Sequence, residues 1–123
     1  MARIEKFEEI EAWKKARKLT QEVYKATAQG PFTKDFGLRD QLQRASVSIM
    51  ANIAEGFDGG SIREFLKFLT YALRSTTEVQ SHLYVAIDQQ YLGQNSFQSL
   101  YDLSVEVKNL ISGFIRYLCS PQP

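Results

Sequence analysis

The residue types needed for acid–base chemistry come together at one place in this sequence, around its single histidine. Ser81 directly precedes His82, and Glu78 lies four residues before it, so a nucleophile, a base and an orienting acid are all present. Neighbouring positions on a helix point about 100° apart, so Ser81 cannot use His82 as its base. We therefore expect a partly exposed helical histidine, and we assign no catalytic residue.

Metal and redox chemistry lack a set of donors at suitable spacing. Cys119 is the only cysteine and His82 the only histidine, which argues against an internal disulfide and a Cys/His zinc site. Glu55, Asp58 and Glu64 cluster around one predicted turn, but no further ligand spacing supports coordination. We interpret them as solvated carboxylates and expect neither a metal nor a cofactor.

Phosphate binding is the remaining chemistry that the side chains could support. Lys and Arg number 15 and Asp and Glu 14, a net charge of +1, so such binding would depend on local clusters. Two clusters are candidate nucleic-acid contacts: Lys14, Lys15 and Lys18, and, further along the chain, Arg63, Lys67 and Arg74. The first is interspersed with Glu11 and Glu22, and the second aligns within about 40° on one helix face. For both, the alternative is a charged outer face that only keeps the protein soluble.

Four amphipathic helices must position these residues. Apolar residues recur at three- and four-residue steps over 8–28, 35–55, 61–90 and 95–118, with turn residues between the four stretches. Ser61 and Glu64 form a capping box at the start of the third stretch. Short connections favour antiparallel neighbours, which predicts an all-α, up-down-up-down four-helix bundle, a single domain over 1–123.

Each helix carries a stripe that should face the core. In the first helix this stripe consists of Trp13, Ala16, Thr20, Val23 and Thr27, widened by Leu19 and Tyr24. In the third helix, 65–73 is apolar on nearly all sides, which indicates burial on more than one side. Phe68 and Tyr71 lie off its core stripe, and we expect them at the interface of a symmetric oligomer. The alternative is a wide core stripe with a few exposed rings.

The turn between the second and third helices sets a register. A turn centred near Asp58 places Arg39 level with Glu78, which predicts a salt bridge that fixes register more than stability. The same register places Asn52 level with Phe65 on the core stripe, where its amide must be hydrogen-bonded. We expect a buried structural amide. The alternative is that Asn52 leans to the edge of the stripe and bonds a neighbouring backbone group.

Composition bounds the class of protein. A hydrophobic fraction of 44% and a charged fraction of 24% over 123 residues are typical of one globular domain. Residues 1–9 lack the apolar segment of a signal peptide, and no stretch is apolar enough to cross a membrane. We expect a cytoplasmic protein without a membrane partner.

Several short motifs occur in an order and spacing that resemble one known family. They are Trp13-Lys14-Lys15-Ala16 with Leu19 and Tyr24; Phe36-Gly37-Leu38 with Gln41-Leu42 and Arg44; Ser48-Ile49; Asn52-Ile53-Ala54-Glu55-Gly56; and Glu64-Phe65 with Phe68-Leu69, Ala72, Ser75 and Glu78. The chain resembles the proteins encoded within 23S ribosomal RNA intervening sequences, also called the four-helix-bundle protein family. The run from Asn52 to Gly56 is the most specific of these elements.

The resemblance implies an antiparallel four-helix bundle that assembles into a ring, commonly a homopentamer, with no established enzymatic activity. It also implies a fold related to the accessory proteins of diversity-generating retroelements, which bind a reverse transcriptase and nucleic acid through a basic ring surface. Members often carry a basic residue soon after the Ala-Glu-Gly run, where this chain has Asp58-Gly59-Gly60. They often have glycine where this chain has Arg74, which adds a positive charge.

The sequence and the resemblance leave three candidate functions. The leading one is a non-enzymatic ring protein that binds structured RNA or an RNA–protein complex through the two basic clusters. The second is a protein-interaction module, or an accessory subunit of a polymerase such as a reverse transcriptase, that uses Phe68 and Tyr71 and makes no nucleic-acid contact. An enzyme ranks third, because no nucleophile–base pair is present.

Overall fold

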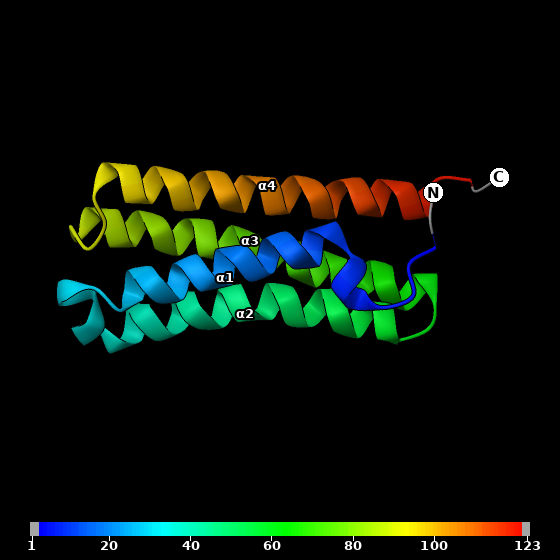
Figure 1. The fold of residues 1–123 in the computed structure, drawn as a ribbon, viewed down its shortest axis with the longest axis horizontal. Helices are drawn as coiled ribbons and strands as arrows, with labels where there is room; N and C mark the ends of the chain where they lie inside the picture. The colour runs from blue at the N-terminus through cyan, green and yellow to red at the C-terminus, as the bar shows by residue number, and fades with distance from the viewer. Residues whose placement is uncertain (1–2, 122–123) are drawn as a thin grey trace.

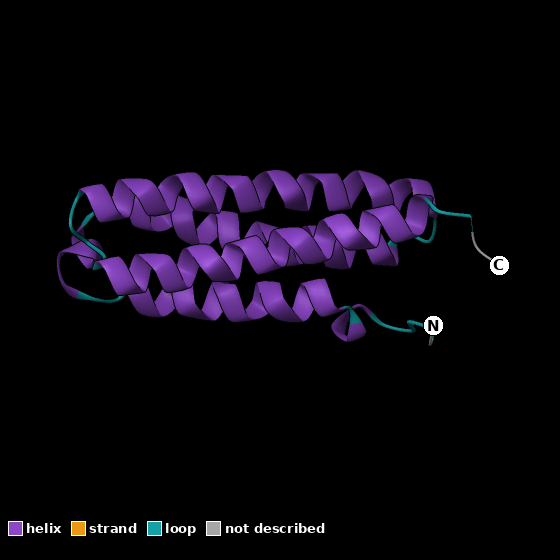
Figure 2. Ribbon diagram, turned by 90° about the horizontal axis from the view of Figure 1, so that it is seen from above, coloured by secondary structure: helices purple, strands orange, loops and turns teal. Residues whose placement is uncertain are grey.

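Four long helices follow one another in alternating directions in the computed structural model, which describes residues 3–121 (Figure 1). They are α1 (Glu11–Thr27), α2 (Phe36–Asp58), α3 (Ile62–Asp88) and α4 (Gln94–Cys119). Two short 3-10 helices, η1 (Phe7–Glu9) and η2 (Gly30–Lys34), precede α1 and connect it to α2. Figure 2 shows only helices and loops in the described part of the chain. The predicted antiparallel four-helix bundle is therefore confirmed.

The helices form a square in which neighbours in sequence are neighbours in space. α2 packs against α1 and α3, and α4 packs against α3 and α1, which closes the square. α1 and α3 therefore lie on opposite corners, and Figure 1 shows α1 in front of α3 with α4 above and α2 below. Because a helix at a corner exposes the side away from the core, the outer faces of α1 and α3 point in opposite directions.

All four helices contribute to one core. Leu19 of α1, Ile49 of α2, Leu69 of α3 and Ile111 of α4 are fully buried. The stripe predicted for the first helix is only partly right, because Trp13 is half-buried and Tyr24 is 46% exposed. The buried stripe of α1 consists of Ala12, Ala16, Leu19, Val23 and Thr27. The observed buried stripe is rotated toward Leu19 relative to the predicted one, so Trp13 and Tyr24 lie between the core and the outer side of α1.

The turn between α2 and α3 lies later in the chain than the sequence predicts. The predicted second helix ends at Glu55, whereas α2 continues through a buried Gly56 to Asp58. The chain then turns at Gly60, whose φ of 86° suits glycine, and Ser61 caps α3 by accepting a hydrogen bond from the Glu64 backbone N–H at 3.1 Å. The register between the two helices shifts accordingly.

The predicted salt bridge between Arg39 and Glu78 is wrong for this reason. Arg39 Nη1 donates to the Thr33 carbonyl at 2.9 Å, and its Nε lies 3.3 Å from Asp40 Oδ1. Glu78 Oε2 instead lies 3.5 Å from Nε2 of His82, one turn along its own helix.

Asn52 satisfies its amide on its own helix. Its Nδ2 donates to the Ser48 carbonyl at 2.8 Å and to Ser48 Oγ at 3.0 Å, and Ser48 Oγ shares a 2.9 Å hydrogen bond with Ser75 Oγ of α3. Ser48 faces Ser75, and α2 and α3 are antiparallel, so Asn52, four residues after Ser48, lies at the height of Tyr71, four residues before Ser75. The prediction that Asn52 lies level with Phe65 is therefore wrong. Asn52 is half-buried at the edge of the contact, the alternative that the sequence left open.

Candidate nucleic-acid interface

The six predicted basic residues divide between two helices that lie on opposite corners of the bundle. Lys14, Lys15 and Lys18 belong to α1, and Arg63, Lys67 and Arg74 belong to α3. Because the outer faces of α1 and α3 point in opposite directions, one subunit does not bring the two clusters together. The structure therefore contains two separate candidate surfaces, which we call the α1 face and the α3 face.

Carboxylates partner most lysines of the α1 face. Lys14 Nζ lies 3.3 Å from Glu11 Oε1, and Lys25 Nζ lies 3.2 Å from Glu22 Oε2, each within the helix. Lys15 reaches across to α4, where its Nζ lies 3.2 Å from Glu106 Oε2. These contacts lower the charge that three of the lysines can offer to a phosphate.

Two further cations on the α1 face have no carboxylate partner. Within residues 3–121, no ion pair includes Arg17 or Lys18, and both side chains are exposed. The Arg17 guanidinium instead lies 5.9 Å from the centre of the Trp13 ring, a cation–π distance. Both cations line an open hollow on the outer side of α1, whose other lining residues are Glu8, Trp13, Lys14, Gln21 and Glu22.

On the α3 face, only one of the three basic residues is paired with a carboxylate in the described part of the chain. Lys67 Nζ lies 2.9 Å from Glu64 Oε2 and 5.2 Å from the centre of the Phe68 ring. The hydrogen bond that Lys67 donates to Glu64, together with the negative charge of Glu64, raises the pKa of Lys67 above its ordinary value, so this side chain is protonated at neutral pH. Arg63 and Arg74 are exposed, and no ion pair of the described residues includes them.

The predicted interface residues lie at the edge between α3 and α2. The rings of Phe68 and Tyr71 meet edge to face with centres 5.7 Å apart. Phe68 is half-buried above Gly56, whereas Tyr71 is 40% exposed. Tyr71 is thus the more accessible of the two, and it borders the α3 face.

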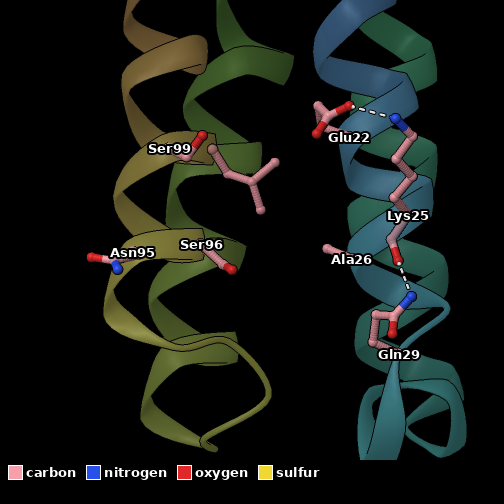
Figure 3. A pocket seen from close by; sticks show the side chains of 8 residues that line it. Glu22, Lys25, Ala26, Gln29, Asn95, Ser96 and Ser99 are labelled. Carbon is pink, nitrogen blue, oxygen red and sulfur yellow. Dashed lines mark hydrogen bonds and ion pairs between the residues drawn. The ribbon is translucent and has the colours of Figure 1, made fainter.

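A polar groove separates the ends of α1 and α4 (Figure 3). Its lining residues are Glu22, Lys25 and Ala26 from α1, Gln29 from the loop that follows α1, and Asn95, Ser96, Ser99 and Leu100 from α4. On the α1 side, Lys25 is turned toward Glu22, and Gln29 Nε2 donates to the Lys25 carbonyl at 3.4 Å. Hydroxyl and amide groups line the α4 side and offer hydrogen bonds, while the two charged groups of the groove, Glu22 and Lys25, are paired with each other.

Within residues 3–121, the side chains that could act in metal binding or acid–base catalysis do not lie together. No group of three His, Cys, Asp or Glu side chains lies close enough to hold a metal ion. His82 is the partly exposed helical histidine that the sequence predicts, with its side chain 16% exposed, and its buried Nε2 has no hydrogen-bond partner among the described residues. Ser81 is exposed and separate from it. No helix of the described chain is long and apolar enough to cross a membrane.

Sequence reasoning missed two residues that the structure brings to the α1 face. Both were predicted on the core stripe: Trp13 packs against the core from its edge, where it also lines the outer hollow with Arg17, whereas Tyr24 is 46% exposed. The available signal was their spacing, since 13, 17 and 24 fall within about 40° on a helix. That stripe combines aromatic and basic residues, whereas the buried stripe consists of small and aliphatic ones.

Comparisons with known proteins place the chain in a family. Its fold resembles the crystal structure of a protein of unknown function from the S23 ribosomal protein family of Bacteroides thetaiotaomicron, with a TM-score of 0.78 and 24% sequence identity. That match covers 85% of this chain and 95% of the other. No curated protein matches the sequence. The family model for the 23S rRNA-intervening sequence protein matches residues 8–113, so this chain belongs to the 23S rRNA-intervening sequence protein family.

Proposed function

We propose that this protein is a non-enzymatic, ring-forming subunit that binds structured RNA, or an RNA–protein complex, in the cytoplasm. The observation that carries the proposal is the set of exposed cations without carboxylate partners on the two outer faces, Arg17 and Lys18 on α1 and Arg63 and Arg74 on α3. Cations that are free of internal partners attract phosphates and release counterions on binding. Membership of a family named for a 23S rRNA intervening sequence supports RNA as the nucleic acid.

The aromatic residues at the α2–α3 edge support assembly into an oligomer. Tyr71 is 40% exposed beside the half-buried Phe68, and aromatic residues with this exposure are typical of subunit interfaces. We propose that a second copy of the chain covers this edge and that repetition of the contact closes a ring. Each ring would then repeat the outer basic faces, which strengthens binding to a long RNA.

The first test measures the native particle mass by light scattering, for the protein alone and with a structured RNA at low and high salt. We expect a ring-sized particle that gains mass with RNA only at low salt, because neutralised phosphates make the affinity fall steeply with salt. Replacing the six predicted contacts by glutamine should abolish that gain, while replacing the remote Lys34 should not. A particle that ignores RNA at both salts would contradict the RNA-binding proposal, and a monomer would contradict the ring.

A second candidate function is binding of another protein through Phe68 and Tyr71, as in an accessory subunit of a polymerase. The exposed Tyr71 ring favours it. Such binding would tolerate salt and would fail in Tyr71→Ala but not in Tyr71→Phe, which keeps the ring. Tyr71→Ala is preferable to Phe68→Ala, because Phe68 also packs against α2 at Gly56.

A further inference from the structure

The two basic faces differ in the charge of the helices that carry them. α1 contains five basic residues and two acidic ones, an excess of three positive charges. α3 contains three basic and three acidic residues and is neutral overall. α2 contains two basic and three acidic residues, and α4 two of each. The positive excess of this protein is therefore concentrated on α1, although its net charge is only +1.

The two edges of α1 differ as well. On the side of α4, Lys15 is paired with Glu106, and Lys18, Glu22 and Asp102 line the hollow beside this pair. On the side of α2, the hydrogen bonds between the two helices join neutral groups: Thr20 Oγ1 donates to the Ser46 carbonyl at 3.2 Å, and Gln43 Nε2 donates to Thr27 Oγ1 at 2.9 Å. A polyanion is repelled from the acidic α4 side and is accepted along the neutral α2 side.

The neutral side is also the side that carries the aromatic residues. Trp13, Arg17 and Tyr24 follow one another along it, and the eleven steps from Trp13 to Tyr24 span about 16 Å at 1.5 Å per residue. Tyr24 is 46% exposed, and Arg17 lies over Trp13 without a carboxylate partner. Proteins bind unpaired nucleotides with this combination, in which cations follow the backbone and rings stack on bases.

We propose that the α1 face, on its α2 side, binds a single-stranded segment of RNA, with Arg17 on a phosphate and Tyr24 stacked on a base. This inference rests on the proposed RNA-binding function and assigns it to one of the two faces. It also removes Lys15 from the contacts, because Glu106 occupies that side chain. The α3 face, next to the α2–α3 edge, contributes little to RNA affinity.

The test measures binding of a labelled single-stranded RNA by fluorescence anisotropy, together with the fluorescence of Trp13, the only tryptophan of the chain. Arg17→Gln is compared with Arg74→Gln, which removes the same charge from the α3 face. Tyr24→Ala is compared with Tyr24→Phe, which keeps the ring. Circular dichroism and particle mass establish that each variant is folded and assembled as the original.

We expect Tyr24→Ala to weaken binding about 5- to 100-fold and Tyr24→Phe to restore it, since stacking needs only the ring. Arg17→Gln should lower the slope of log affinity against log salt by about 0.7, the contribution of one phosphate contact to a single strand. Arg74→Gln should leave both quantities nearly unchanged. Trp13 fluorescence should change on binding, because the strand lies beside Arg17.

Other outcomes separate this inference from the function on which it rests. RNA binding that depends on Arg74 and not on Arg17, or that leaves Trp13 fluorescence unchanged, would overturn the assignment to the α1 face and leave RNA binding intact. A perfect duplex of the same sequence that binds as tightly as the single strand would overturn the stacking role of Tyr24. If the unaltered protein binds neither RNA, the proposed function and this inference both fail.

Discussion

The contact between α2 and α3 is built from small side chains, and the contact between α1 and α4 from long ones. Gly56 brings α2 against Phe65 and Phe68, and two serine hydroxyls meet across the same contact. Between α1 and α4, the ion pair of Lys15 and Glu106 bridges the helices, and open grooves lie along the rest of the contact. Small residues allow backbones to approach and exclude solvent, whereas long charged side chains keep the surface open.

This difference predicts where stability and binding are located. The α2–α3 contact should tolerate little change, because any added atom meets a neighbour on the facing helix. The α1–α4 contact should tolerate substitution, since exposed ion pairs contribute little. A surface that tolerates substitution can carry a binding function without loss of the fold, which agrees with the assignment of RNA binding to α1.

The largest expected effect comes from two glycines that both lie within helices. A Cβ at Gly56 would lie 2.7 Å from Phe68 Cβ and 3.1 Å from Phe65 Cδ1, so α2 and α3 would have to separate. We expect Gly56→Ala to lower the free energy of unfolding by about 1–3 kcal/mol. At Gly113 of α4, a Cβ would meet only Arg116 Nη2 at 3.7 Å. We expect Gly113→Ala to raise the free energy of unfolding by about 0.5–1 kcal/mol. Urea unfolding of both variants measures these changes, and equal effects would contradict the comparison.

A smaller effect is expected from the serine pair of the α2–α3 contact. Ser75→Ala removes the partner of Ser48 Oγ, while Asn52 still donates to that hydroxyl. The expected loss is about 1 kcal/mol in the free energy of unfolding. A double-mutant cycle with Ser48→Ala isolates the term between the two hydroxyls, and additive single effects would show that the hydrogen bond contributes nothing.

The ion pair of the α1–α4 contact should contribute less. Both Lys15 and Glu106 are exposed enough for solvent and salt to screen them, with side chains 36% and 55% exposed. A double-mutant cycle with Lys15→Gln and Glu106→Gln should give a coupling energy of about 0–1 kcal/mol that disappears in molar salt. A coupling as large as that of the serine pair would mean that the two contacts do not differ as proposed.

The smallest effect at neutral pH concerns a link between two loops at one end of the bundle. Tyr91 OH donates to Asp35 Oδ2 at 3.0 Å, while Asp35 Oδ1 caps α2 by accepting from the Leu38 backbone N–H. The hydrogen bond to Asp35 raises the pKa of Tyr91 above 10.0, because the proton is held between them.

A tyrosine with a raised pKa in the folded state stabilises the protein below pH 10 and loses that contribution as pH rises through its folded pKa. Unfolding measured between pH 8 and about pH 11 should therefore show a steeper alkaline loss of stability for the unaltered protein than for Tyr91→Phe. Parallel curves would show that the hydrogen bond has no effect on stability.

The helices themselves could be predicted from sequence because their periodicity is local. The error at the end of α2 shows where local signals are ambiguous. Gly56 has the sequence position of a helix-ending glycine, yet it lies inside α2 because Phe68 and Phe65 need the space. Tyr24 was misassigned, and Trp13 was placed too deep in the core, for a related reason, since an aromatic residue near a core stripe can pack inward or lie at its edge.

The sequence by itself determined the four helices, their antiparallel order and the family, because these depend on residue spacing along one chain. Only the tertiary structure decided the register of α2 against α3, which depends on where two backbones can approach. It also decided that the basic residues of α1 and α3 form two faces and not one. That outcome depends on which helices lie on opposite corners of the square, and the spacing within a single helix carries no information about it.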